Sequence, residues 1–80
     1  MEKNEIIAKV QDIFRTVLDD EDIVLSNEST ADDIEEWDSL NNLLLLVQIE
    51  KTFGVKFTSN ESSSWQNVGE MIESLYAKLN

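Results

Sequence analysis

Apolar residues recur every three or four positions in two stretches of this 80-residue chain, and this spacing constrains the fold more than any other feature. Residues 3–18 and 65–79 each place these side chains along one side of a helix. Between them, residues 39–53 are rich in leucine and end before Gly54, and glycine supplies the left-handed conformation that closes many helices. The recurring positions are Ile6, Ile7, Val10, Ile13, Phe14, Val17, Leu18, Trp65, Val68, Ile72, Leu75, Tyr76 and Leu79. The pattern predicts an all-α fold with three main helices.

The longest connection, residues 19–38, carries ten acidic side chains and no basic one. Neither the helical nor the strand period runs through it, which predicts a long, solvated loop. An apolar triplet near its middle, Ile23, Val24 and Leu25, is expected to anchor the loop on the core and keep it ordered.

A shorter helix is predicted after Gly54. Thr58 and Glu61 have the spacing of a capping box, which begins a helix. No linker rich in proline or glycine divides the chain, because it has no proline and two glycines. We therefore expect a four-helix bundle in one domain, residues 1–80, with three main helices, one short third helix and a long loop after the first helix.

The composition disfavours several classes of function. Seventeen acidic against six basic residues leave a net charge of -11, which opposes nucleic acid binding and self-association and predicts a monomer with positively charged partners. The chain lacks cysteine and histidine, so it has neither a thiolate nucleophile nor an imidazole base, and we expect no enzyme. It also lacks a cationic leader and an apolar run of about 18 residues, which predicts a cytoplasmic protein without membrane insertion.

Two acidic clusters have some features of functional sites. A calcium loop starting at Asp19 would need glycine at its sixth position and glutamate at its twelfth, where the chain has Val24 and Thr30. Glu35, Glu36 and Asp38 could supply a pair of carboxylates for acid–base chemistry, but nothing in the sequence predicts the burial that would shift a pKa. We therefore expect solvated acidic turns and no metal site.

The helix predicted over residues 39–53 has two apolar sides. At about 100° per residue, four apolar residues fall on one side and four on nearly the opposite side. Either the helix is buried all round, or one side stays partly exposed and binds a partner or an apolar chain. We favour the second interpretation. The first side holds Leu45, Leu46, Ile49 and Phe53, and the second, which would be exposed, holds Leu40, Leu43, Leu44 and Val47.

Ser39 follows a predicted helix cap. If the Asp38 carboxylate accepts a hydrogen bond from the first turn, Ser39 becomes the first helical residue and its hydroxyl points outward. A phosphate attached there would be stabilised by the free N–H groups at the start of the helix. The alternative is that Asp38 merely caps a helix that happens to continue with serine.

Three segments together resemble the acyl carrier protein family across nearly the whole chain. They are WDSL at the start of a helix, the E-x-x-F-G-V pattern at residues 50–55, and NVGEMIESL at the start of the last helix. The resemblance implies that a phosphopantetheinyl transferase attaches the 4′-phosphopantetheine arm of coenzyme A to Ser39, with Asp38 and Leu40 presenting the serine. It also implies that the arm's thiol holds an acyl group as a thioester, which agrees with the absence of cysteine.

The chain departs from the family's fatty acid synthesis carriers along its second helix. Asn41, Leu44 and Lys51 stand where acidic residues are common, and only Glu50 remains acidic. Acyl-loading and acyl-transferring enzymes with basic or apolar docking surfaces are therefore the expected partners. The residues predicted to bind them are Glu35, Glu36, Trp37, Leu40, Leu44, Val47 and Glu50.

The cargo and the pathway stay open at this point. Trp37 before Asp-Ser-Leu resembles carriers of specialised pathways, such as lipid, polysaccharide or natural-product assembly. An aminoacyl carrier, D-alanyl or peptidyl, is an alternative. A different class is an unmodified acidic interaction module, for which Ser39→Ala would have no effect.

Overall fold

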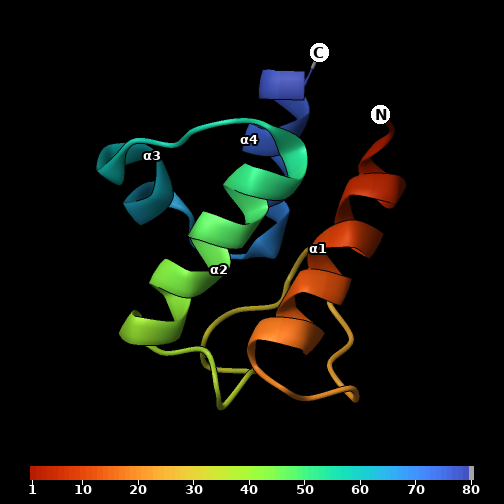
Figure 1. The fold of residues 1–80 in the computed structure, drawn as a ribbon, viewed down its shortest axis with the longest axis vertical. Helices are drawn as coiled ribbons and strands as arrows, with labels where there is room; N and C mark the ends of the chain where they lie inside the picture. Colours follow the sequence, from red (N-terminus) through yellow and green to blue (C-terminus); the bar gives the residue numbers. More distant parts are fainter. Residues whose placement is uncertain (80) are drawn as a thin grey trace.

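The structure, a computed structural model, describes residues 1–79 and forms a bundle of four helices without strands in that part of the chain (Figure 1). Helix α1 packs against both α2 and α4, and the short α3 lies between the ends of α2 and α4 along the chain. The expected all-α bundle, with its short third helix and its long loop after the first helix, is confirmed. The helices are α1 (Lys3–Val17), α2 (Ser39–Phe53), α3 (Ser59–Ser64) and α4 (Val68–Leu79).

The core forms where the apolar stripes of the three long helices meet. Burying one large aliphatic or aromatic side chain contributes about 1.5–3 kcal/mol, so this cluster is the main source of stability. The most deeply buried side chains are Ile6, Val10, Phe14, Leu45, Ile49, Val68, Met71 and Leu75.

None of the described helices is both long and apolar enough to cross a membrane.

Local signals set most of the helix ends as predicted. Gly54 adopts the left-handed conformation, with φ 67° and ψ 35°, and closes α2. Thr58 and Glu61 form the reciprocal capping box that begins α3. The apolar stripe of the last helix was extended too far, to Trp65, whereas the NVGEMIESL segment gave the start correctly. Asn67 Oδ1 accepts a hydrogen bond from the backbone N–H of Glu70 at 2.9 Å, and α4 begins at Val68.

The first half of the long loop is fastened to α1. Arg15 Nε donates to the carbonyl of Ile23 at 2.8 Å, and Gln11 accepts from the N–H of Leu25 at 3.0 Å. Ile23 and Leu25 are buried as expected, whereas Val24 is 73% exposed. The expected anchoring by Val24 was therefore wrong, because neighbouring side chains of an extended segment point to opposite sides.

The middle of the loop is fastened to the start of α4. The N–H groups of Val68 and Gly69 donate to the carbonyls of Ser29 and Asn27 at 2.8 and 2.9 Å. Such bonds satisfy two of the donors that a helix leaves unpaired at its start. A Cβ atom on Gly69 would lie 2.8 Å from the Asn27 oxygen, so this approach requires glycine. These contacts fix the position of the loop relative to α4, before the chain continues into α2.

Candidate functional site

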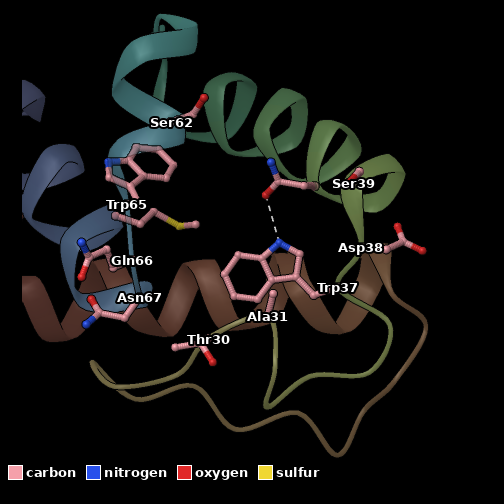
Figure 2. A pocket seen from close by; sticks show the side chains of 11 residues that line it. Thr30, Ala31, Trp37, Asp38, Ser39, Ser62, Trp65, Gln66 and Asn67 are labelled. Atoms are coloured by element: carbon pink, nitrogen blue, oxygen red, sulfur yellow. Dashed lines mark hydrogen bonds between the residues drawn. The ribbon is translucent and has the colours of Figure 1, made fainter.

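Ser39 is the first residue of α2 and its side chain is exposed. As predicted, Asp38 caps the helix, with Oδ1 accepting from the N–H of Asn41 at 2.8 Å. In Figure 2 the Asp38 carboxylate points away from the Trp37 ring, at the outer edge of the first turn. The Ser39 hydroxyl has no hydrogen-bond partner among the described residues, which leaves it free to react.

The backbone before Ser39 is held from both sides. The ring of Trp37 meets that of Phe14 edge-on, with centroids 4.9 Å apart, and its Nε1 donates to Asn42 Oδ1 at 2.9 Å (Figure 2). The Asn41 side chain donates to the carbonyl of Glu36 at 2.8 Å. A carboxylate at position 41 could not donate this hydrogen bond. The bond therefore explains why asparagine, and not an acidic residue, suits position 41. Trp37 therefore packs against the core and holds the backbone before Ser39 in place.

One side of α2 stays exposed along its length. We call this side the outer face, and its exposure excludes the interpretation that α2 is buried all round. The prediction that it remains open is confirmed. The outer face consists of Leu40, Leu43, Leu44 and Val47, which are 69%, 61%, 52% and 49% exposed.

The acidic residues predicted to bind partners lie in two different environments. Glu35 is exposed and Glu36 is half-buried, both just before the start of α2. Glu50 is half-buried near the other end, where Oε2 accepts from the N–H of Phe57 at 2.8 Å. This bond holds the chain that returns after α2, a structural role that the sequence reasoning missed. No lysine or arginine occurs from residue 16 to 50, so the potential around Ser39 is negative.

A cleft of about 380 Å³ opens beside Ser39. Figure 2 shows Trp37 and Trp65 bordering it, with Asn67 on the far side from Ser39. Its walls come from the loop, the first turn of α2, α3, the α3–α4 connection and α4. The sequence reasoning missed this cleft, because no pattern within one segment reveals a cavity built from five.

The comparisons with known proteins agree with this geometry. The family model described as a phosphopantetheine attachment site matches residues 8–75. The chain belongs to the acyl carrier protein family. The carrier is 32% identical to the acyl carrier proteins of two strains of Borreliella burgdorferi, ZS7 and B31, over 72 residues that make up 90% of each chain.

A solved structure supports the same assignment of this carrier. The solution NMR structure of the holo acyl carrier protein from Geobacter metallireducens matches with a TM-score of 0.87 and 38% identity. The match covers 92% of this chain and 85% of that one. The carrier therefore shares both the sequence pattern and the helix arrangement of the family.

An acyl carrier protein of this family uses a 4′-phosphopantetheine prosthetic group. When bound, the group supplies a thiol that holds the acyl group, a function that no side chain here can provide because the chain has no cysteine. The exposed, unpartnered hydroxyl of Ser39 fits the attachment of such a group. It lies at the positive end of α2, where the N–H groups of the first turn favour an anion.

Proposed function

We propose that this carrier receives 4′-phosphopantetheine on the Oγ atom of Ser39 and presents acyl groups from that position. The observation that carries the proposal is a free, exposed hydroxyl directly after the helix cap of Asp38. In the transfer, a bond forms between Oγ and the phosphorus of the pantetheine phosphate. The diphosphate P–O bond of coenzyme A breaks, 3′,5′-ADP leaves, and the hydroxyl proton passes to a base on the transferase.

The neighbours of Ser39 support this role without taking part in the bond changes. The Asp38 carboxylate already accepts a hydrogen bond from the first turn, so it holds Ser39 in place. Leu40 is the most exposed residue of the outer face and lies next to the serine, where a transferase can contact it. Trp37 fixes the preceding backbone through its contact with Phe14.

The outer face of α2 and the acidic residues just before it form one proposed docking surface. The transferase and the acyl-loading and acyl-transferring enzymes would all bind there. Leu44 and Val47 continue the apolar surface from Leu40, while Glu35 and Glu36 add negative charge at its edge. A complementary partner has an apolar hollow with basic residues beside it. The net charge of -11 opposes self-association, so the proposed carrier acts as a single-domain monomer.

The decisive experiment is the intact mass of the protein after incubation with coenzyme A, magnesium and a broad-specificity phosphopantetheinyl transferase. We expect the natural sequence to gain one phosphopantetheinyl group and Ser39→Ala to gain none. Ser62→Ala is the matched control, because Ser62 borders the same cleft and should not affect the modification.

Two results would contradict the proposal. A gain of mass by Ser39→Ala would place the attachment on another residue. No gain by the natural sequence with several transferases would favour an unmodified acidic interaction module, whose partner binding should weaken strongly with salt.

A further inference from the structure

Lys51 continues the outer face toward the end of α2. At about 100° per residue, its side chain leaves the helix axis within about 40° of those of Leu40, Leu44 and Val47. Lys51 is exposed and is the basic residue of the last turn. The surface that begins with apolar side chains beside Ser39 therefore ends with a positive charge.

The charge of Lys51 is not balanced within the protein. Its ammonium group forms no ion pair with any described residue. The neighbouring acid, Glu50, is half-buried and accepts from the N–H of Phe57, so its carboxylate is directed to the chain that follows α2. An exposed ammonium group without such a partner remains available to an anionic group of another protein.

The other end of the outer face carries the opposite charge. Glu35 and Asp38 are exposed, Glu36 is half-buried, and none of the three forms an ion pair with a described residue. At about 1.5 Å per residue, the helix separates Asp38 from Lys51 by about 20 Å. The docking surface thus has a negative end beside Ser39, an apolar middle and a positive end.

Two occupants fit this charge pattern, and they differ in what happens to Ser39. A second copy could pair in the antiparallel sense, with Lys51 of each copy against Asp38 of the other. That arrangement would cover Ser39 and bring together two chains with a charge of -11 each. An enzyme that covers the apolar middle can leave the serine within reach of its own active site. The surface is therefore better suited to an enzyme.

We propose that the outer face binds its enzymes in one orientation, with a basic group of the enzyme at Glu35 and Glu36 and an acidic group at Lys51. The inference deepens the proposed function and rests on the outer face as the docking surface. The reversed orientation would bring like charges together at both ends, which disfavours it. The bound enzyme therefore always presents the same part of its surface to Ser39.

The test uses a helical peptide of about 14 residues as the probe, because a helix of that length spans about 20 Å. Leucines line one side of the peptide, arginines stand at one end and glutamates at the other. A nitroxide label is attached to either end in separate preparations. Two-dimensional ¹H–¹⁵N NMR of the unmodified full chain measures how strongly the label broadens the amide signals of Glu36 and Thr52.

The expected result is a preferred orientation of the peptide. A label at the glutamate end should broaden the Thr52 signal about fivefold more than the Glu36 signal, and a label at the arginine end should reverse the ratio. Equal broadening, or the opposite ratio, would overturn the orientation. No broadening at either amide would reject the outer face as the site for such a partner. Outer-face signals that change with protein concentration without peptide would assign the face to a second copy.

A charge reversal separates Lys51 from the rest of the surface. Lys51→Glu should bring the broadening ratio close to one, because both ends of the outer face are then acidic. Lys9→Glu is the matched control, since it makes the same charge change at an exposed position of α1, which packs against the other side of α2. It should leave the ratio unchanged. A ratio that persists in Lys51→Glu would contradict the role of Lys51, and an unchanged Ile49 amide signal would show that the core is intact.

Failure of this test and failure of the attachment at Ser39 are distinguishable, because the peptide is added before any modification. A gain of one phosphopantetheinyl group without a preferred peptide orientation would retain the attachment and reject the role of Lys51. A preferred orientation without a gain of mass would retain the charge pattern of the docking surface and reject the attachment.

Discussion

The two apolar sides of α2 have similar composition and opposite environments. On one side, Leu45 and Ile49 are at most 1% exposed because they face the core shared with α1 and α4. On the outer face, Leu43 and Leu44 remain more than half exposed. Both sides belong to one helix, so the difference lies in what each side faces. The inner side stabilises the fold, and the outer face is available for binding.

A contiguous exposed apolar surface needs an explanation in a folded protein. Single exposed leucines are common, but contiguous apolar patches mark binding sites or favour aggregation. Here the high negative charge of the chain counteracts aggregation. The outer face begins beside the free hydroxyl of Ser39, which connects it with the proposed attachment of the prosthetic group.

The strongest test of the comparison is a matched pair of truncations on α2. Leu45→Ala should lower the free energy of unfolding by about 2–5 kcal/mol, because it leaves a cavity in the core. Leu43→Ala should change it by less than about 0.5 kcal/mol, because the side chain is already exposed. Urea denaturation followed by circular dichroism measures both. Equal losses for the two variants would show that the outer face also supports the fold.

A second substitution tests the binding role of the outer face. Leu44→Gln keeps a good helix former and adds no charge, so the fold should be unaffected. We expect kcat/KM for phosphopantetheinyl transfer to fall about tenfold, which corresponds to about 1.4 kcal/mol. The loss should persist at high salt, because the missing contact is apolar and salt screens only the charges.

Val24→Gln is the control for this experiment. Val24 is also exposed and apolar, but it lies in the loop and outside the outer face. Its substitution should leave transfer unchanged. If both variants react like the natural sequence at all salt concentrations, docking depends on the acidic residues instead of the outer face.

The features that could be predicted from the sequence are those that depend on neighbouring residues. The helix cap of Asp38, the stop at Gly54 and the capping box of Thr58 and Glu61 each involve residues within three or four positions. The two sides of α2 could also be separated, because helical geometry fixes the angle between residues. The prediction that the Leu40 side is the exposed one, made because this side lies beside Ser39, is confirmed as well.

The features that could not be predicted depend on segments far apart in the sequence. The cleft needs Trp37 and Trp65 to come together across the fold, and the role of Glu50 depends on the path of the chain to Phe57. The apolar spacing alone would extend the last helix back to Trp65. The cap at Asn67, the first residue of the NVGEMIESL segment, determines where the hydrogen-bonded turns begin.

The smallest expected effect concerns α3, which has no buried residue and so contrasts with the inner side of α2. The backbone N–H of Thr58 and the ammonium group of Lys78, at 2.9 and 3.0 Å, lower the pKa of the partly exposed Glu61 carboxyl below its ordinary value. A lowered pKa in the folded state stabilises α3 above the pH at which an unfolded glutamate titrates. This contribution is lost as the pH falls through the folded pKa.

Acidification should therefore loosen α3 while the buried part of α2 stays intact, because Leu45 and Ile49 hold α2 on the core by packing, whereas α3 has no buried residue. Amide NMR signals of Thr58 and Ile49, followed from neutral pH downward, measure the two helices separately. Glu61→Gln should remove most of the pH dependence at Thr58, since the amide oxygen can still accept from the backbone but no longer titrates. Simultaneous changes at both amides would show that α3 is coupled to the core and is not held mainly by its capping box.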